Sequence, residues 1–394
     1  MADRPKLLVI CDYFLPGFES GGAMRTLVNM IDRFSDRFDF RVVARDHDGP
    51  HNLKPYTTVN IGEWNDLGNC QVYYLSRSDI GIGTIRRLIA EVRPNAIYLN
   101  SVFSPLTIRT LLLRRFGRIG GVPVVLAPEG ELCVGALTLN PLRKAVFLTG
   151  AKMIGLYRDL IWKAAADTEK EDVERVLGHD GQMFVAPNMP PRTIFDEYNA
   201  DNKPSKDTGS ARFIFLSRFM RKKNLNWVLS HLHSITGDLT IDIYGPIEEQ
   251  DYWAETKKII ASLPPNIKVE AKGLVSPEKV AGTLFSYDLF ILPTIGENFG
   301  HVCIESLAAG CPLVISDQTP WRDLEEYGIG WDLALDNAAA WSSLIQRCVD
   351  MHNAEYSRMS RAARSYAECW LADPSVESTN LAVLDAATKA ARQP

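Results

Sequence analysis

Short apolar runs alternate along the chain with longer segments whose apolar residues recur at helical spacing. The helical pattern is clearest at 24–34 and 84–92. Strands are predicted at 6–11, 40–44, 96–100, 122–126, 213–217, 239–244, 267–271, 289–292 and 313–316. Such alternation is typical of parallel sheets with helices on their faces. The pattern therefore predicts an α/β protein built from doubly wound sheets.

The chain is long enough for two domains, because 394 residues are about two to three times the usual length of one. Residues 196–212 are polar and rich in turn formers, which predicts a linker. We therefore expect one domain over 1–195 and a second over 213–374. Residues 375–394 have a helical pattern and are expected to brace the first domain. Two such domains would face a cleft, with ligands beyond the carboxyl ends of the strands.

Composition and charge exclude several classes of protein. A content of 46% hydrophobic and 23% charged residues excludes a disordered chain. The net charge of −5 gives no reason to expect a nucleic-acid partner. The seven cysteines form no C-x-x-C pair, and we find neither a signal peptide nor an apolar run of about 18 residues. We therefore expect reduced thiols and a cytoplasmic location.

The most informative passage is residues 289–316, "LFILPTIGENFGHVCIESLAAGCPLVIS". An apolar strand ends before a glycine-containing loop that carries Glu297, and a helix is predicted to start near Phe299. Glu305 follows on that helix. The first amides of a helix, here those of Phe299 and Gly300, favour a phosphate or a sugar hydroxyl. Two carboxylates can accept hydrogen bonds from vicinal hydroxyls, which suits a sugar and a ribose.

The spacing E-x7-E of Glu297 and Glu305, with Asn298, Phe299 and Gly300 between them, resembles the retaining nucleotide-sugar glycosyltransferases of family four. These group 1 glycosyltransferases have the GT-B architecture of two Rossmann-like domains. The resemblance implies that Glu297 contacts the donor sugar near the reacting centre and that Glu305 holds the nucleotide ribose. The alternative is a pair of solvated glutamates near a helix start.

Two cations follow the first strand of the second domain, in "FIFLSRFMRKKNLNW". Arg218 and Lys223 lie at a strand end, where they can stabilise a departing pyrophosphate without a metal. Their R-x4-K spacing is similar to that of the family, although Asn224 stands where glycine is usual. Arg221 and Lys222 are rivals for this role, and we expect both to be solvated.

Other positions resemble donor-binding elements of the family less strongly. Gly245 corresponds to the turn after the second strand, and Leu274 lies where the backbone meets the nucleotide base. Gly21 and Gly22 precede a helix and resemble the glycine pair that contacts the donor diphosphate or sugar. Gly245 and the neighbouring Gly273 are equally compatible with ordinary turns, whereas Gly21 and Gly22 are distinguished only by their position after the first strand.

The first domain is expected to be the acceptor side, and the second the donor side. The pair Glu129-Gly130 stands where a His-Gly or Arg-Gly is usual in the family. Glu129 is therefore predicted to bind a sugar hydroxyl, to bind a cationic group, or to face away, and Glu131 is its rival. Thr168, with Glu171 three residues later, predicts a helix cap.

Residues 101–163 contain nine basic and three acidic residues in a chain of negative net charge. Apolar residues are interleaved with the basic ones. This pattern makes the segment a candidate for peripheral attachment to an anionic membrane, on the inner face. The alternative is a set of core-packed helices with solvated charged faces.

The resemblance implies a retaining hexosyltransferase that moves a sugar from a UDP or GDP donor to a hydroxyl acceptor. The passage "GENFGHVCIE" is similar to enzymes of bacterial surface-polysaccharide assembly, which implies a lipid-linked or growing glycan. We expect no cofactor and no metal, because 46–48, the sequence Asp-His-Asp, has the D-x-D form in the wrong domain and predicts a polar turn.

Two other classes of protein also have doubly wound domains. A dinucleotide-dependent oxidoreductase should have a G-x-G-x-x-G fingerprint after its first strand, which this chain lacks. A catalytically silent nucleotide-sugar-binding or scaffold protein of the same fold stays open.

Overall fold

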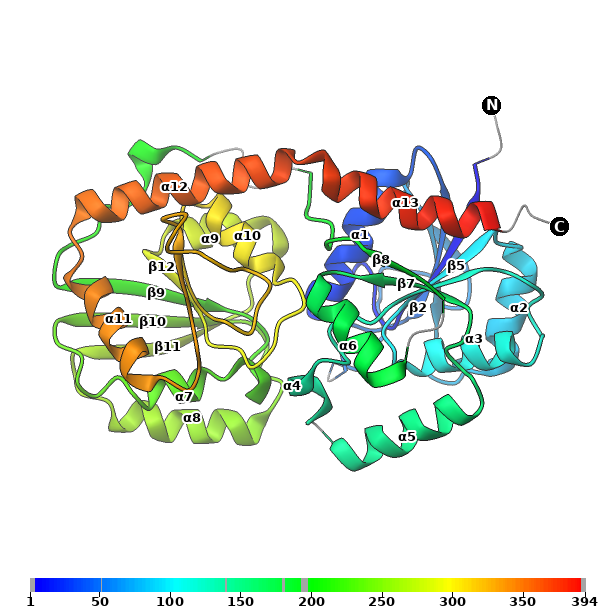
Figure 1. Ribbon diagram of the computed structural model, residues 1–394, viewed down its shortest axis with the longest axis horizontal. Helices are drawn as coiled ribbons and strands as arrows, with labels where there is room; N and C mark the ends of the chain where they lie inside the picture. The colour runs from blue at the N-terminus through cyan, green and yellow to red at the C-terminus, as the bar shows by residue number, and fades with distance from the viewer. Residues whose placement is uncertain (1–3, 51, 139, 179–180, 193–197, 391–394) are drawn as a thin grey trace. The chain divides into compact units, whose positions relative to one another are not determined.

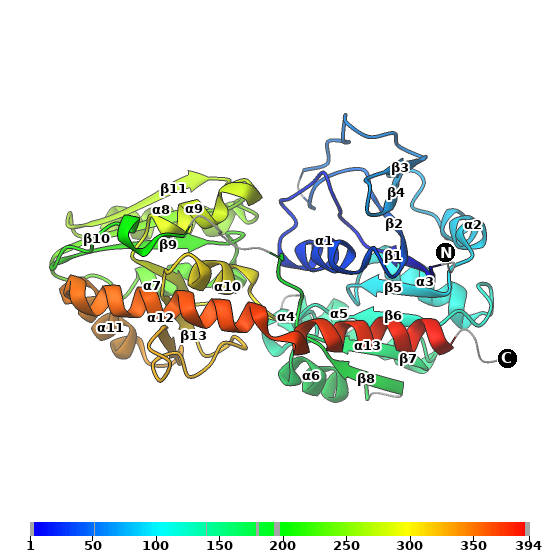
Figure 2. The same cartoon turned by 90° about the horizontal axis from the view of Figure 1, so that it is seen from above.

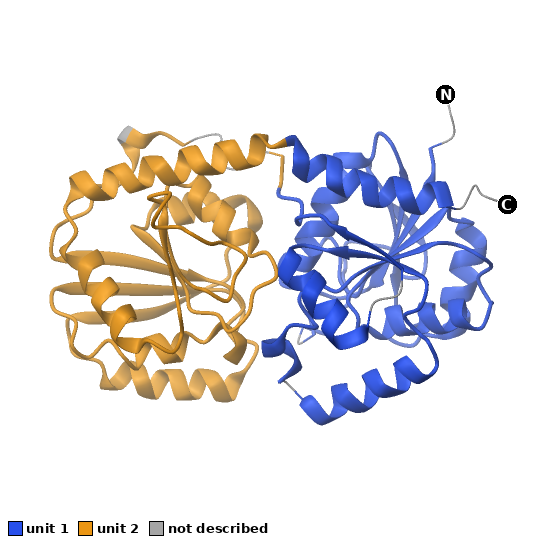
Figure 3. Ribbon diagram, in the orientation of Figure 1, with its two compact units in different colours: residues 1–190, 374–394 blue, residues 191–373 orange. Residues whose placement is uncertain are grey.

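A computed structural model describes residues 4–50, 52–138, 140–178, 181–192 and 198–390. The chain divides into two compact units (Figure 3). Unit 1 contains Met1–Pro190 and Pro374–Pro394, and unit 2 contains Pro191–Asp373. The predicted domain limit at 195, the first two residues of the predicted linker and the last four residues of the predicted brace lie outside the described residues.

Unit 1 contains a sheet of eight strands in the order β3-β4-β2-β1-β5-β6-β7-β8 (Figure 1). Within the described residues, each pair of neighbouring strands is parallel except β3 with β4. The strands are β1 (Lys6–Ile10), β2 (Asp39–Arg45), β3 (Trp64–Asp66), β4 (Gln71–Leu75), β5 (Ala96–Asn100), β6 (Val124–Ala127), β7 (Leu160–Ala164) and β8 (Gly181–Val185).

Helices cover this sheet, and the last of them comes from the end of the chain (Figure 2). They are α1 (Gly22–Phe34), α2 (Ile82–Val92), α3 (Pro105–Arg115), α4 (Val134–Leu137), α5 (Pro141–Met153), α6 (Asp167–Leu177) and α13 (Pro374–Ala390). Helix α13 packs beside β6, β7 and β8. Asn380 donates to the Pro187 carbonyl over 2.8 Å, and Arg33 forms an ion pair with Glu377 at 2.9 Å.

Unit 2 contains a six-stranded parallel sheet in the order β11-β10-β9-β12-β13-β14. The strands are β9 (Ser210–Leu216), β10 (Asp238–Tyr244), β11 (Ile267–Gly273), β12 (Leu289–Leu292), β13 (Leu313–Ser316) and β14 (Gly330–Leu333). Strand β9 begins inside the range 196–212 that the sequence indicated as a linker. The α/β class with two parallel-sheet domains is confirmed.

The helices of unit 2 lie on both faces of its sheet (Figure 1). They are α7 (Leu225–Leu229), α8 (Gln250–Ser262), α9 (Val280–Phe285), α10 (His301–Ala308), α11 (Ala338–Asp350) and α12 (Asn353–Ala372). Short 3-10 turns occur at η1 (Ala200–Asn202), η2 (Arg221–Lys223) and η3 (Pro277–Lys279).

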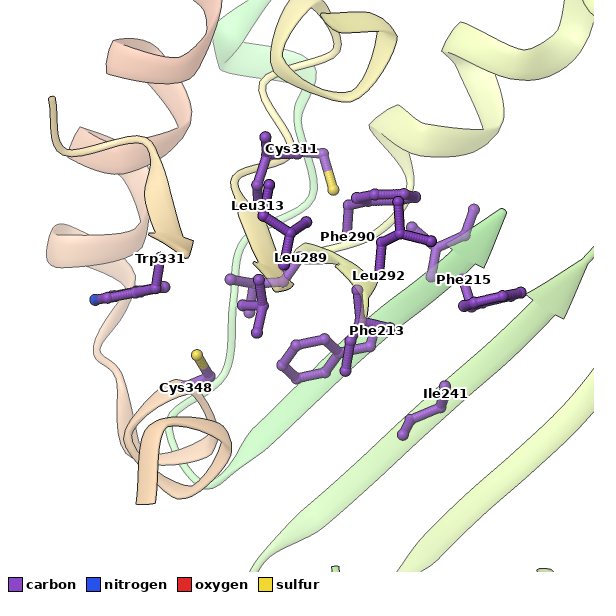
Figure 4. Close-up of a cluster of buried hydrophobic side chains, with 14 of the residues drawn as sticks. Phe213, Phe215, Ile241, Leu289, Phe290, Leu292, Cys311, Leu313, Trp331 and Cys348 are labelled. Carbon is purple, nitrogen blue, oxygen red and sulfur yellow. The ribbon is translucent and has the colours of Figure 1, made fainter. Parts of the chain in front are cut away.

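The core of unit 2 is formed by side chains from its central strands. Phe213, Leu289 and Leu313 come from three neighbouring strands and lie together in the buried cluster (Figure 4). Strands buried on both faces read as continuous apolar runs, which is why β9, β12 and β13 were predicted. Strands β3, β4, β7, β8 and β14 were not predicted: β3 and β14 are short, β8 is partly exposed, and Lys163 interrupts β7. Strand β4 has an unbroken apolar run and was missed all the same.

Truncation of a central core side chain tests this packing. Phe213 is fully buried on β9, so Phe213→Ala should lower the free energy of unfolding of unit 2 by about 3–5 kcal/mol. Amide hydrogen exchange of β9 and β12 measures this loss. Tyr327→Ala, at an exposed residue of the same unit, is the control and should change protection little. Equal protection in both variants would contradict the assigned core.

Candidate active site

The two central strands of unit 2 define where a ligand site is expected. From β9 the chain proceeds outward to β10 and β11, and from β12 it proceeds the other way to β13 and β14. The loops that follow β9 and β12 therefore leave the sheet in opposite directions, and the topology predicts a ligand crevice between them at the carboxyl edge of the sheet. The two loops are bonded together, because the Lys222 carbonyl accepts from the Ile295 amide at 2.9 Å and from the Thr294 hydroxyl at 3.1 Å.

Lys223 and Glu297 meet across this crevice. The Lys223 ammonium donates to Glu297 Oε2 in an ion pair, and both side chains are largely buried. Burial raises the pKa of a carboxyl, but the charges of Lys223 and Lys222 outweigh it, so the pKa of Glu297 lies below its ordinary value. Glu297 is therefore a carboxylate at neutral pH, fixed beside a buried cation.

The start of α10 is built closely around Glu297. Gly300 caps the helix with a φ of 75°, and a Cβ at this position would lie 3.1 Å from Glu297 Cγ. Only glycine combines that backbone conformation with that close approach. The Glu297 amide donates to the Gln318 carbonyl at 2.9 Å, and the Asn298 amide donates to Glu297 Oε1 at 3.2 Å. The helix itself begins at His301, two residues later than expected.

Phe299 and Glu305 are both buried. The Phe299 ring packs 5.5 Å from the ring of Trp321, and the Trp321 indole donates to the Phe299 carbonyl at 2.5 Å. The Phe299 side chain thus anchors the loop in the core, which leaves its backbone as the part suited to a ligand. Glu305 lies on the second turn of α10.

Arg218 pairs with Glu248 on the loop after β10, at 3.2 Å. Gly245 makes the approach of these two loops possible: its φ is 128°, and a Cβ there would lie 2.0 Å from the Ser217 carbonyl oxygen. Arg221 is exposed and bonds Glu255 of α8 at 2.6 Å, in agreement with its expected solvated role. Lys222, in contrast, adds its charge to the field around Glu297.

Leu274 follows the end of β11 and is half exposed. The adjacent Gly273 accepts a hydrogen bond at its carbonyl from the Gly245 amide, at 2.9 Å. The loops after β10 and β11 therefore lie next to each other at the carboxyl edge of the sheet.

In unit 1, the loop after β1 carries Gly21 and Gly22. Gly21 caps α1 with a φ of 83°, and Gly22 is the first residue of the helix. Asp48 holds the same loop, because its carboxylate accepts from the Phe18 amide at 2.6 Å and the Glu19 amide at 3.0 Å. The Asp-His-Asp sequence at 46–48 is buried in unit 1, where bends at residues 46 and 48 lead into a turn at 49–50.

Glu129 lies at the carboxyl edge of unit 1, directly after β6. Its φ of 53° is unusual for a residue other than glycine. The two carboxylate oxygens accept from the amides of Asn100 and Asn188, each at 3.0 Å. Lys163, in the middle of β7, donates to the Asn188 amide oxygen and is fully buried. Burial lowers the pKa of Lys163, and the nearby Glu129 and Glu169 oppose that change.

Glu169 is a second buried carboxyl of this network. Its carboxylate accepts from the Gly130 amide at 2.5 Å and from the Ala165 amide at 2.7 Å. Burial, and then the charge of Glu129, raise the pKa of Glu169 to about 7. The predicted cap at Thr168 is wrong: Ala166 precedes the helix and Thr168 lies inside it. The carboxylate of the next residue bonds the chain at the helix entry instead.

Glu131 is used by the loop after β5. Its carboxylate accepts from the Ser101 hydroxyl at 2.8 Å and from the amides of Val102 at 2.6 Å and Phe103 at 3.1 Å. Burial raises the pKa of Glu131, whereas these hydrogen bonds lower it. Glu129 and Glu131 are rivals for one role in the sequence prediction, but in the structure the two carboxylates have separate hydrogen-bond partners.

Sequence reasoning missed four members of the unit 1 network: Asn100, Lys163, Glu169 and Asn188. Lys163 carried a usable signal, because a lysine inside the apolar run "LIWKA" is rarely buried without a partner. The other three are polar residues at element ends, which are common on any surface.

Neither a metal cluster nor a membrane span was found in the part of the chain that the structure describes. No group of three or more histidine, cysteine or carboxylate side chains there has a geometry suited to a metal ion. No helix among those same residues combines the length and apolarity needed to cross a bilayer.

Residues 196–366 match the family described as "Glycosyl transferases group 1". No curated protein sequence matches the chain significantly. The chain therefore carries a group 1 glycosyltransferase domain, which includes the loops that hold Lys223 and Glu297.

Solved structures share the fold of the whole chain. HepE of Anabaena, in complex with UDP and glucose, is 15% identical with a TM-score of 0.68, over 98% of this chain and 100% of that one. Sucrose-phosphate synthase of Thermosynechococcus elongatus is 16% identical with a TM-score of 0.71, over 98% and 99%. WaaG, a glycosyltransferase involved in lipopolysaccharide biosynthesis, is 12% identical with a TM-score of 0.67, over 95% and 99%. The chain has the GT-B fold.

The buried carboxyl of Glu169 should make unit 1 less stable as the pH rises. The pKa is about 7 in the folded protein against an ordinary 4.5, so only the unfolded chain ionises between these values. The contribution of this carboxyl to the free energy of unfolding is fully present below pH 4.5 and decreases as the pH rises to about 7. The total decrease is about 3 kcal/mol. Glu169→Gln, which cannot ionise, should remove that loss.

Hydrogen exchange of β6 and β7 amides across this pH range measures the difference. Glu171→Gln, at an exposed glutamate of the same helix, is the matched control and should keep the wild-type slope. If Glu169→Gln also keeps the wild-type slope, the carboxyl is ionised in the folded protein and the assignment is wrong.

Proposed function

We propose that this protein is a retaining glycosyltransferase that moves a hexose from a nucleoside diphosphate sugar to a hydroxyl of a glycan acceptor. The observation that carries the proposal is the ion pair of Lys223 and Glu297 at the crevice of unit 2, beside the glycine start of α10. This arrangement offers a cation, helix amides and a fixed carboxylate within one small region. A sugar diphosphate needs all three.

The cations serve the pyrophosphate. We assign Lys223 and Arg218 to the leaving phosphate oxygens, because negative charge grows there as the bond to the sugar breaks. Lys223 has three N–H donors and can keep Glu297 while it binds a phosphate oxygen. Arg218 is half exposed and pairs with Glu248, so it is free to reorient when a stronger anion arrives. The amides of Phe299 and Gly300 lie at the positive end of α10 and supplement these charges.

We assign the carboxylates of Glu297 and Glu305 to hydroxyl groups of the donor. Glu297 accepts hydrogen bonds from the donor sugar, and Glu305 accepts them from the ribose. Asn298, Gly245 and Leu274 complete the donor side, and Gly21 and Gly22 of unit 1 contact the diphosphate or sugar. That HepE binds UDP and glucose supports a uridine nucleotide. A guanosine nucleotide is the alternative.

The transfer is expected to occur on one face of the sugar. The bond between the anomeric carbon and the phosphate oxygen breaks first, with both electrons going to that oxygen. The acceptor hydroxyl then bonds the same face of the carbon, and its proton moves to the departing phosphate oxygen. Lys223 and Arg218 lower the energy of this ion pair, and the protein needs no covalent intermediate.

On the acceptor side we assign Glu129 and its network, with Glu131 as a support of the adjoining loop. The involvement of WaaG in lipopolysaccharide biosynthesis supports a lipid-linked or growing surface glycan as acceptor, and with it a cytoplasmic reaction. The proposed chemistry uses no metal and no cofactor besides the donor.

Loss of either member of the central ion pair should slow transfer strongly while the fold survives. Lys223→Met and Glu297→Gln should each lower kcat/KM by roughly 10²–10³-fold, since each removes one charge that acts on the transition state. Turnover is measured by nucleoside diphosphate release in the presence of candidate acceptors. Lys268→Met, an exposed lysine of the same unit, should retain full activity.

Wild-type turnover in Lys223→Met would refute the site. The alternative outcome is tight binding of a nucleotide sugar, detected as a thermal shift, without nucleotide release in the presence of any acceptor. That result would make the chain a catalytically silent binding protein of this fold.

The stereochemistry of the product tests the mechanism separately. Transfer from a UDP-α-hexose should give an α-linked product, because bond breaking and bond formation use the same face. Proton NMR of the anomeric signal during the first turnovers distinguishes α from β. A β-linked first product would show inversion and would replace this mechanism with one that has a general base opposite the leaving group.

A further inference from the structure

Helix α5 is apolar on two opposite faces, and only one of them is used by the fold. Phe147, Leu148 and Ala151 face the core of unit 1, where Phe147 packs 5.7 Å from the ring of Phe103. At about 100° per residue, Leu142, Val146 and Met153 fall in one line on the opposite side. Their exposed fractions are 82%, 74% and 80%.

Two neighbouring segments extend this exposed line. Arg115, at the end of α3, donates to the Ile154 carbonyl at 2.5 Å, which places the loop with Phe116 beside the last turn of α5. Phe116 is 68% exposed. At the other end, Lys144 donates to the Ala136 carbonyl at 2.6 Å and joins α5 to α4. Figure 1 shows α5 at the edge of unit 1, with α3 and α4 as its neighbours.

The nine basic residues of 101–163 differ in how the fold uses them. Lys163 is buried, Lys144 bonds Ala136, Arg109 bonds the Pro105 carbonyl, Arg114 bonds the carbonyls of Arg158 and Asp159, and Arg115 bonds Ile154. Arg143 and Lys152 are different, because both are exposed and lie on either side of the apolar line of α5. Residues 132–158 contain no acidic residue at all.

We propose that the α5 surface, formed by Leu142, Val146 and Met153 with Arg143 and Lys152, docks on an anionic membrane. The line from Leu142 to Met153 spans about 16 Å, enough to lie along the boundary between headgroups and acyl chains. The two flanking cations have long side chains that reach anionic headgroups while the apolar residues insert. The proposal does not depend on the proposed catalytic function.

The charge favours a lipid surface over a second copy of the chain. A symmetric dimer through this surface would bring Arg143 and Lys152 towards their own copies, and like charges repel. An anionic bilayer pairs with all of these cations at once. Apolar side chains at this degree of exposure, in one line, are uncommon on a surface that only faces water.

Sedimentation of the full chain with lipid vesicles tests the proposal. Wild-type protein should bind vesicles that contain phosphatidylglycerol, bind phosphatidylcholine vesicles at least about tenfold more weakly, and lose binding as the salt concentration rises. No binding to phosphatidylglycerol vesicles would overturn the proposal.

Two variants with matched controls separate the apolar and the charged parts of the surface. Leu142→Ser with Val146→Ser and Met153→Ser should weaken binding by about tenfold or more, whereas Leu53→Ser with Ile82→Ser, exposed elsewhere on unit 1, should not. Arg143→Glu with Lys152→Glu should weaken it by more than about tenfold. Arg86→Glu with Lys258→Glu makes the same change of net charge at other exposed sites and should have a small effect.

The variants keep nucleotide binding, because they lie outside the proposed site, and a thermal shift with UDP checks that the fold is intact. If the matched controls weaken vesicle binding as much as the α5 variants, net charge and not this surface is responsible. If sedimentation velocity shows that the wild type self-associates and the α5 serine variant does not, while vesicle binding is unchanged, the surface is an interface between copies.

Discussion

A buried cation must have a partner, and this constraint organises the carboxyl edge of unit 2. Lys223 and Glu297 come from loops that leave the sheet in opposite directions, and each charge offsets part of the desolvation cost of the other. The hydrogen bonds from Ile295 and Thr294 to the Lys222 carbonyl hold the loops at the distance that the pair requires. Gly300 has no side chain, which allows the start of α10 to lie close to the Glu297 carboxylate. One ion pair thus fixes two loops and a helix terminus in the geometry on which the proposed phosphate site rests.

Unit 1 has a similar edge with a different charge balance. Glu129 and Glu169 both act on the charge of the buried Lys163. Burial and the charge of Glu129 raise the pKa of Glu169 to about 7, and Glu129 accepts hydrogen bonds from two side-chain amides. The edge of unit 1 thus combines two carboxyl groups with one buried lysine, whereas the edge of unit 2 pairs one carboxylate with one buried lysine.

The sequence predicted the parts of the fold that depend on local pattern. Strands buried on both faces, such as Leu289–Leu292, have unbroken apolar runs, and α1 has a regular apolar face. Strand β7 was not predicted because Lys163 interrupts its apolar run. The buried Lys163 ammonium donates a hydrogen bond to Asn188, which lies 25 residues away in the sequence. The pairing of Lys223 with Glu297 joins residues 74 apart and follows only from strand order. Residue types and loop positions were thus accessible from sequence, whereas partners were not.

The charges in the crevice of unit 2 explain why the helix start matters. Arg218, Lys222 and Lys223 bring three positive charges, but Glu248 and Glu297 already neutralise two of them. A nucleoside diphosphate carries more negative charge than the remaining cation can balance. The backbone amides at the start of α10 add positive potential through the helix dipole, so that no further buried cation is needed. Gly300 permits that approach, so the conformation of one glycine determines whether the crevice has enough positive potential for its proposed ligand.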